Sequence, residues 1–183
     1  MRIISGKHKG RRINAPRGLP VRPTTDMAKE ALFNILNNNY YFEDLVVLDL
    51  FSGTGNISFE FASRGSSEIV AVDKDYRCIK FISKMAEELG FSISAIKSDV
   101  FKFIEKINLN FDIIFVDPPY SFTIDDCSRI ASIVFQRQLL NENGVLIIEH
   151  SKHTDLSALE NFKYMKKYGG SVFSFLEPNK AME

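Results

Sequence analysis

The sequence predicts an α/β fold in which a mostly parallel, seven-stranded sheet is covered on both faces by helices. Three observations carry this prediction. Between residues 45 and 149, short apolar runs alternate with amphipathic stretches of helical period. The turn Gly53-Thr54-Gly55 separates the first apolar run from the helix that follows it. Near the C-terminus, Gly169-Gly170 joins two further apolar runs and indicates a hairpin, which we expect to add antiparallel pairing at the sheet edge.

The individual elements follow from runs of apolar residues and their period. Strands are predicted over residues 45–50, 68–72, 92–97, 111–116, 144–149, 162–168 and 171–176. Between them, helices are predicted over residues 56–63, 76–89 and 100–107, and residues 124–140 are expected to be mostly helical. A further helix precedes the first strand and runs to about Asn37, with Thr24, Thr25 or Asp26 as its N-cap.

The composition is that of a globular protein without a membrane span. The chain has 183 residues, of which 45% are hydrophobic and 25% are charged, so it can bury a core without disulfides or metals. No apolar run approaches the ~20 residues of a membrane helix, and the N-terminus lacks the apolar core of a signal peptide. Cys78 and Cys127 are isolated, and no metal site is predicted. We therefore expect a cytoplasmic protein, and we expect a monomer.

Basic residues are concentrated at the start of the chain. Residues 1–29 carry eight basic residues and one acid, whereas the rest carries 15 basic and 22 acidic residues. This asymmetry indicates contact with nucleic acid. Gly6 and Gly10 bracket a basic tip, which predicts a hairpin or extended arm over residues 1–23, ahead of a main domain over residues 24–183.

Acidic residues lie at the carboxyl ends of three predicted strands in a pattern that suits S-adenosylmethionine. Asp49 precedes a glycine turn, residues 53–55, that permits close approach of the backbone to a ligand. Ser58 replaces the third glycine of a dinucleotide fingerprint, and a carboxylate at Asp49 attracts a sulfonium but repels a diphosphate. Asp73 is placed to accept hydrogen bonds from the ribose hydroxyls. Asp99 is placed either to cap the helix that follows it or to accept a hydrogen bond from the adenine amine. The predicted cofactor site comprises Asp49, Phe51, Gly53, Gly55, Asp73, Lys74, Asp99 and Val100.

Residues 117–120, Asp-Pro-Pro-Tyr, follow the fourth predicted strand and form the candidate catalytic motif. Pro118 and Pro119 end the strand's ladder and stiffen the turn, at the edge where ligands bind in open α/β sheets. The nitrogen of an aromatic exocyclic amine is a poor nucleophile. The Asp117 carboxylate and the Pro118 carbonyl can accept its hydrogens and draw it towards sp³ geometry, and Tyr120 can stack on a flipped base.

With these motifs together, the chain resembles class I S-adenosylmethionine-dependent methyltransferases that carry a (D/N)PP(Y/F) motif, and among them it is similar to the RsmD family. The likeness to that family covers nearly the whole chain. It rests on residues 2–6, 10–11, 22–26, 30–34, 49–55, 117–120 and 168–170. The resemblance implies a Rossmann-like class I methyltransferase fold and methyl transfer to the N2 amine of one guanine in 16S ribosomal RNA, within the assembling small subunit.

The resemblance also implies roles for the N-terminal residues. Arg22 and Thr24 would close the cofactor pocket, and the arm would bind RNA phosphates. The tip, residues 7–9, lacks an aromatic residue expected in some relatives, which leaves its base contacts open. The residues implied in RNA binding are Arg2, Lys7, His8, Lys9, Arg11, Arg12 and Arg17.

The motifs leave other functions open. An adenine-N6 methyltransferase acting on DNA or RNA would use the same catalytic motif, although the chain has no obvious insert for target recognition. A non-catalytic RNA-binding scaffold and a nicotinamide-dependent dehydrogenase are weaker alternatives. For Glu149 and His150, at the end of the fifth predicted strand, we expect a structural role, although a general base is conceivable.

Overall fold

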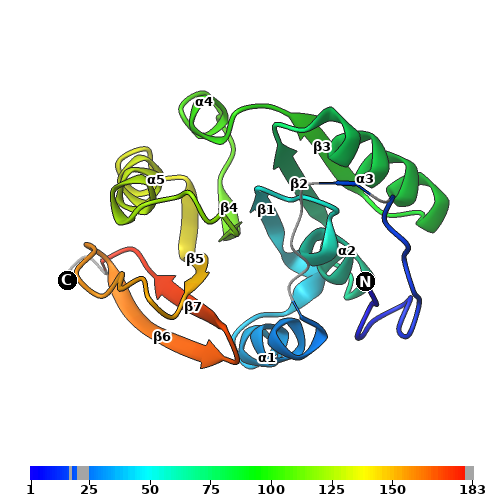
Figure 1. The fold of residues 1–183 in the computed structure, drawn as a ribbon, viewed down its shortest axis with the longest axis horizontal. Helices are drawn as coiled ribbons and strands as arrows, with labels where there is room; N and C mark the ends of the chain where they lie inside the picture. The colour runs from blue at the N-terminus through cyan, green and yellow to red at the C-terminus, as the bar shows by residue number, and fades with distance from the viewer. Residues whose placement is uncertain (17, 20–24, 180–183) are drawn as a thin grey trace.

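The computed structural model describes residues 1–16, 18–19 and 25–179. Its centre is a seven-stranded sheet with the strand order β3-β2-β1-β4-β5-β7-β6 (Figure 1). Strands β1 to β5 pair in parallel, whereas β7 pairs antiparallel with both β5 and β6. The predicted fold class is confirmed, and the last strand of the chain lies second from the edge of the sheet.

Most elements begin and end close to the predicted positions. The helices are α1 (Asp26–Asn37), the short 3₁₀ helix η1 (Phe42–Asp44), α2 (Asn56–Ser63), α3 (Tyr76–Leu89), α4 (Val100–Ile104) and α5 (Ile124–Gln136). The strands are β1 (Val46–Leu50), β2 (Glu68–Asp73), β3 (Ile93–Lys97), β4 (Phe111–Val116), β5 (Leu140–Ser151), β6 (Phe162–Tyr168) and β7 (Ser171–Leu176). Among the three candidate N-caps of α1, the structure selects Thr25, whose Oγ1 accepts a hydrogen bond from the Ala28 N–H at 3.2 Å.

Several predicted boundaries are wrong by two or more residues. Helix α4 ends at Ile104 instead of residue 107, and α5 ends at Gln136 instead of residue 140. Strand β5 spans Leu140–Ser151 instead of residues 144–149. The early start of β5 follows from the end of α5, where Gln138 adopts a positive φ of 53° and turns the chain back towards the sheet. A register shift between Phe111 and Ile113 then accommodates the extra residues of β5, a local feature that apolar periodicity does not reveal.

The helices form two layers, one on each face of the sheet. Helices α1, α2 and α3 cover one face, and α4 and α5 cover the other (Figure 1). Alternate residues of the central strands enter the two cores, as shown by Val47 on the α1 side and Leu48 on the α5 side. Within the described residues, no helix has the length and apolar character needed to cross a membrane.

The N-terminal arm is a hairpin that packs against the main body of the protein. Its strands meet at one antiparallel bridge, between Arg2 and Arg12. The apolar residues Ile3 and Ile13 are buried in a core shared with α2 and α3. At the tip, the Lys7 N–H donates to the carbonyl of Ser63, the last residue of α2, at 2.7 Å. The tip of the arm is therefore anchored at the C-terminal end of α2.

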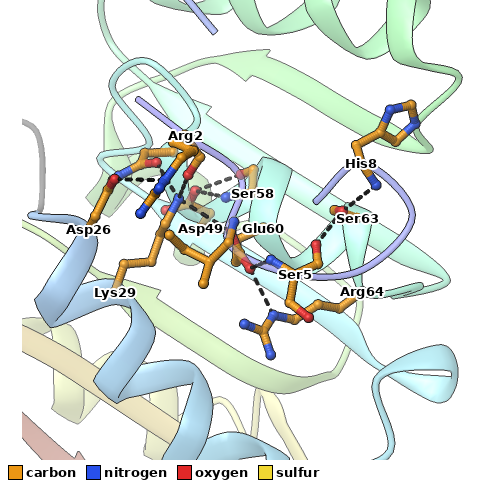
Figure 2. Close-up of polar contacts among 12 residues, drawn as sticks. Arg2, Ser5, His8, Asp26, Lys29, Asp49, Ser58, Glu60, Ser63 and Arg64 are labelled. Atoms are coloured by element: carbon orange, nitrogen blue, oxygen red, sulfur yellow. Dashed lines mark hydrogen bonds and ion pairs between the residues drawn. The ribbon is translucent and has the colours of Figure 1, made fainter. Parts of the chain in front are cut away.

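A buried ion pair beneath the arm joins it to two helices (Figure 2). Lys29 of α1 and Glu60 of α2 both have 0% exposure, and their charged atoms lie 3.3 Å apart. The Lys29 ammonium also donates to the Arg2 carbonyl at 2.7 Å and to Asn56 Oδ1 at 2.8 Å. An ammonium has three hydrogens, so these three acceptors satisfy it completely. Burial lowers the pKa of Lys29, and the nearby Glu60 carboxylate opposes that shift.

Glu60, the acidic residue of the pair, also binds the backbone of the arm. Its two carboxylate oxygens accept hydrogen bonds from the backbone N–H groups of Ile4, at 2.8 Å, and Ser5, at 3.0 Å. The guanidinium of Arg64 donates to the same carboxylate at 2.9 Å. A buried carboxylate with this set of donors is well satisfied, and its partners come from three different segments of the chain.

We predict that Gly6→Ala destabilises the protein by about 1–3 kcal/mol more than Gly10→Ala does. Both glycines adopt a positive φ, +80° and +82°, so alanine strains both backbones. At Gly6, however, the added Cβ would lie 1.8 Å from the Ser63 carbonyl oxygen, whereas nothing lies within 4 Å at Gly10. Urea unfolding of both variants measures the difference, and equal losses would contradict the tight docking of the tip.

We also predict that Lys29→Met lowers the free energy of unfolding by about 2–4 kcal/mol, because it leaves Glu60 buried without its ammonium partner. The double variant Lys29→Met/Glu60→Gln removes both charges and should recover part of that loss. Urea unfolding of the wild type and the two variants provides the comparison. A double variant less stable than Lys29→Met would argue against the burial of an uncompensated charge as the cause.

Candidate active site

The carboxyl ends of four parallel strands meet at one edge of the sheet, called here the carboxyl edge. In the ladder, Leu50 pairs with both Val72 and Val116, and Asp73 pairs with Lys97. The loops that follow β1, β2, β3 and β4 therefore lie side by side. This arrangement brings together four acids that the sequence analysis singled out, namely Asp49, Asp73, Asp99 and Asp117.

The turn between β1 and α2 is built from unusual backbone angles. Phe51, Gly53 and Gly55 have φ values of 60°, 52° and 78°. A Cβ on Gly55 would lie 2.9 Å from Cγ1 of Ile82, so glycine here also permits α2 to pack closely on α3. Phe51 adopts this conformation without being a glycine. Backbone strain of this kind is common where a turn must present its N–H groups to a ligand.

Asp49 is a buried acid at the end of β1. Asp49 is only 2% exposed. Its Oδ2 accepts hydrogen bonds from the Ser58 N–H at 3.2 Å and from the Ser58 hydroxyl at 2.5 Å. Burial raises the pKa of Asp49 to about 7, although both bonds from Ser58 act in the opposite direction. Ser58, which replaces the third fingerprint glycine, is thus the direct partner of this acid.

Asp73 organises the loops around it. One carboxylate oxygen accepts a hydrogen bond from the Gly53 N–H at 2.9 Å, and the other accepts one from the Asp75 N–H at 2.8 Å. Asp73 is half-buried, so part of its carboxylate remains accessible to a ligand hydroxyl, while Lys74 beside it is exposed. The acid therefore links the β1 and β2 loops directly.

Asp99 caps the helix that follows β3. Its carboxylate accepts a hydrogen bond from the Lys102 N–H at 3.1 Å, which is the N-cap role of an aspartate. Asp99 itself is exposed, whereas Val100 is buried in the core on the α5 side. The predicted contact of Asp99 with adenine stays a prediction.

Three phenylalanine rings join the loops of this edge. Phe122 follows the Asp-Pro-Pro-Tyr motif. The centroid of its ring lies 4.9 Å from that of Phe51 in an edge-to-face contact and 6.0 Å from that of Phe101 in a stacked one. Phe51 belongs to the predicted cofactor site, whereas Phe101 was not predicted from the sequence. The signal for Phe101 was its place in the first turn after Asp99, at the start of a helix beside the predicted site. These rings offer an apolar wall next to the acids.

The Asp-Pro-Pro-Tyr motif forms a tight turn directly beside the β1 loop. The Asp117 N–H donates to the Leu50 carbonyl at 3.4 Å, and the Phe122 N–H donates to the Pro119 carbonyl at 2.9 Å. Asp117 and Pro118 are half-buried, whereas Tyr120 is 75% exposed. The motif thus places Asp117 and Pro118 at partly covered positions of the carboxyl edge, whereas Tyr120 is exposed to solvent.

The tip of the arm lies away from the carboxyl edge. Its anchor, Ser63, ends α2, an eight-residue helix about 12 Å long that begins at this edge. His8 is half-buried, and the centroid of its ring lies 4.9 Å from that of Phe91 in an edge-to-face contact, so the ring packs on the protein itself. The basic residues Lys7, Lys9, Arg11 and Arg12 are exposed, and Arg2 forms a partly exposed ion pair with Asp26 at 3.2 Å.

Three predicted site residues, Arg17, Arg22 and Thr24, lie outside the described residues. Among the residues that are described, no group of three or more His, Cys, Asp or Glu side chains is arranged to hold a metal ion.

Comparison with known proteins finds a matching family model and relatives that are named as ribosomal RNA methyltransferases. A family model described as conserved hypothetical protein 95 matches residues 1–177. YlbH of Bacillus subtilis (strain 168), named provisionally as an rRNA methyltransferase, is 33% identical over 161 residues, which cover 85% of each chain. Ribosomal RNA small subunit methyltransferase D of Buchnera aphidicola subsp. Baizongia pistaciae (strain Bp) is 30% identical over 150 residues, covering 81% of this chain and 75% of the relative.

A solved structure supports the fold. The T. thermophilus 16S rRNA N2 methyltransferase RsmC, described in complex with AdoMet and guanosine, superposes with a TM-score of 0.70 at 23% identity. The match covers 88% of this chain and 46% of that chain. The chain therefore shares the fold of that structure, with its sheet and helical layers. Together with the match of the family model over almost the whole chain, this shows that the protein belongs to the RsmD family of methyltransferases.

Proposed function

We propose that this protein transfers a methyl group from S-adenosylmethionine to the exocyclic N2 amine of a guanine in 16S ribosomal RNA. The observation that carries the proposal is the hydrogen bond from the Asp117 N–H to the Leu50 carbonyl, which sets the catalytic motif directly against the β1 loop. A methyl donor held by one loop would lie beside an amine held by the other. The relative named ribosomal RNA small subunit methyltransferase D and the neighbour described as a 16S rRNA N2 methyltransferase support 16S ribosomal RNA as the substrate.

The residues of the carboxyl edge fit the cofactor. S-adenosylmethionine supplies an activated methyl group on a positively charged sulfur. Asp49 can neutralise part of the positive charge of the donor. The accessible part of the Asp73 carboxylate can accept ribose hydroxyls, and the three phenylalanine rings provide an apolar wall for a flat heterocycle. The neighbour described in complex with AdoMet gives this assignment further support.

The catalytic motif is suited to bind and orient the amine. The Asp117 carboxylate and the Pro118 carbonyl accept its two hydrogens, which frees the nitrogen lone pair from the ring and points it at the methyl group. Both acceptors sit on a turn stiffened by two prolines, so little reorganisation is needed in the transition state. Tyr120, exposed at the rim, can stack on the flipped base and exclude water from one of its faces. After transfer, one amine proton leaves to Asp117 or to solvent.

The arm supplies the electrostatic contact with RNA. Its exposed side chains, Lys7, Lys9, Arg11 and Arg12, carry positive charge along α2, away from the catalytic motif. Contacts of this kind bind phosphates and position the RNA without reading its sequence. We place the RNA bases around the target guanine at the carboxyl edge of the sheet. A neighbouring stretch of the RNA sugar–phosphate backbone would lie along the arm.

The function is tested by analysing nucleosides from 16S RNA of cells with and without the protein. We expect one N2-methylguanosine to be absent without it. Purified protein and tritiated S-adenosylmethionine should restore that nucleoside on small subunits from the deletion strain. Label found on adenine, or on DNA alone, would reject the guanine assignment, and failure of calorimetry to detect cofactor binding would reject a methyltransferase activity altogether.

Replacing Asp117 with asparagine should lower turnover by about 10²–10³-fold, because a neutral amide accepts hydrogen bonds from the amine more weakly than a carboxylate does. Affinity for S-adenosylmethionine should change little. Asp125→Asn, at an exposed acid in the next helix, serves as the matched control. Single-turnover rates and calorimetry measure the two effects, and an unchanged rate would contradict the role of Asp117.

The affinity for S-adenosylmethionine should increase as the pH is raised from 6 to 8. Burial raises the pKa of Asp49 to about 7, so its carboxyl group is mostly neutral at the lower pH and mostly ionised at the higher one. Because a cation binds the ionised form, the affinity for the cofactor should increase by up to about tenfold across this pH range. In Asp49→Asn, the part of the pH dependence of cofactor affinity that is due to this carboxyl group should disappear. Calorimetry at both pH values tests this, and parallel profiles for the two proteins would exclude the contact.

A further inference from the structure

The chain has a second basic segment besides the arm. Residues 150–170 carry four basic and two acidic residues, whereas residues 30–149 and 171–183 together carry 11 basic and 20 acidic residues. Strand β6 has three lysines among its seven residues and no acid. A basic segment within an otherwise acidic body indicates a surface that meets a polyanion.

Three lysines of this segment gather at the carboxyl edge of the sheet. Strands β5 and β6 both pair antiparallel with β7, so β6 runs in the same direction as β5 and ends at the same edge. Lys166 and Lys167 lie near that end of β6. Lys152 directly follows β5, and the ladder places the end of β5 level with the end of β6. Lys152, Lys166 and Lys167 are called here the β6 patch.

The positive charge of the β6 patch is available to a ligand. All three lysines are exposed, and within the described residues none of them forms an ion pair shorter than 4 Å. The two acids of the segment, Asp155 and Glu160, are also exposed and unpaired by the same measure. The neighbouring His150 adds little charge, because burial lowers its pKa. Its Nε2 hydrogen-bonds with Ser174 Oγ at 2.8 Å and its Nδ1 with the Ser151 carbonyl at 2.9 Å.

The β6 patch and the arm lie on opposite sides of the catalytic motif. The arm packs on α2 and α3 in a core that includes Ala71 of β2, whereas β6 is the strand at the far end of the sheet (Figure 1). The Asp-Pro-Pro-Tyr motif follows β4, which lies between them. Three strand spacings, about 15 Å, separate β4 from β6. About four nucleotides cross that distance at the 3.4 Å rise of a nucleic-acid strand.

The middle of the carboxyl edge is acidic, so RNA phosphates are better held at its two flanks. Asp73 and Asp117 lie at the ends of β2 and β4, and carboxylates there repel a phosphate. Resting on the proposed function, we propose that the β6 patch is a second RNA-binding surface, which contacts phosphates on the side of the target guanine opposite the arm. Contacts of this kind position the substrate, while the bases around the target lie over the catalytic motif.

Lysines on an edge strand can also serve to prevent pairing with the strands of other chains. Charge of either sign provides that protection, whereas phosphate binding requires positive charge. Protection also concerns the whole length of β6, including Lys163, which is exposed and lies about 10–13 Å from Lys166 and Lys167 along the strand. The two roles therefore differ in their dependence on the sign of the charge and on its position.

The experiment measures methylation of small subunits from a deletion strain, together with binding of 16S RNA at increasing salt concentration. In Lys166→Glu/Lys167→Glu, KM for the subunits should rise at least about tenfold while kcat and the affinity for S-adenosylmethionine stay unchanged. The slope of log K against log salt should become shallower by about 1.4–1.8, because each phosphate contact contributes about 0.7–0.9. Lys166→Arg/Lys167→Arg keeps the positive charge and should retain the KM and the salt slope of the wild type.

Lys106→Glu/Lys163→Glu is the matched control, because it changes the net charge equally at two exposed lysines outside the β6 patch. Its KM should rise by less than about threefold. Lys152→Glu, in the loop after β5, changes no residue of the edge strand and should raise KM by about threefold or more.

Equal increases of KM in the two double variants, or an unchanged KM in Lys152→Glu, would overturn the inference and leave the proposed function intact. A Lys166→Glu/Lys167→Glu protein that oligomerises on gel filtration and keeps the salt slope of the wild type would show edge protection alone, which would also overturn it. Absence of guanine methylation by the wild type would instead overturn the proposed function.

Discussion

The buried pair of Lys29 and Glu60 is the interaction on which the rest of this structure depends. Charges are stable in a protein core only when hydrogen bonds satisfy them. Here the partners of the pair come from the arm, from α1 and from α2, so satisfying two charges fixes three segments at once. One of those partners, Asn56, is the first residue of α2 and directly follows the glycine turn. The same pair therefore fixes the arm and supports the loop where a cofactor would bind.

The acids of the carboxyl edge shape the loops before any ligand binds. Asp73 accepts N–H groups from two loops, and Asp99 caps a helix. Asp49 is held by Ser58, on the helix that follows the turn. The loops are thus preorganised by the very carboxylates that the proposed function assigns to the ligand. A ligand that contacts these acids adds to bonds already made, which limits the conformational entropy lost on binding.

Much of the fold could be predicted from sequence because its signals are local. Apolar runs, glycine turns and the two prolines after β4 depend on neighbouring residues, and they were sufficient to place the strands and the order of the acids along the carboxyl edge. The sequence could not pair Lys29 with Glu60, since 31 positions separate them and a lysine within an apolar helix face gives no partner. Nor could it show that His8 packs on Phe91, or that β5 begins early through a register shift, because both result from tertiary packing. The contact of Phe101 with Phe122 likewise joins loops that only the folded sheet brings together.

The position of β7 has a consequence for how the molecule is made. This strand is the last in the sheet to be synthesised, yet it lies between β5 and β6. Until residues 171–176 leave the ribosome, the outer side of β5 has no neighbour, and Leu146 and Ile147 remain without their partners Leu176 and Phe175. Nascent chains therefore carry an open apolar strand that invites pairing with other chains. A chain truncated before β7 should therefore be a substrate for chaperones and proteases.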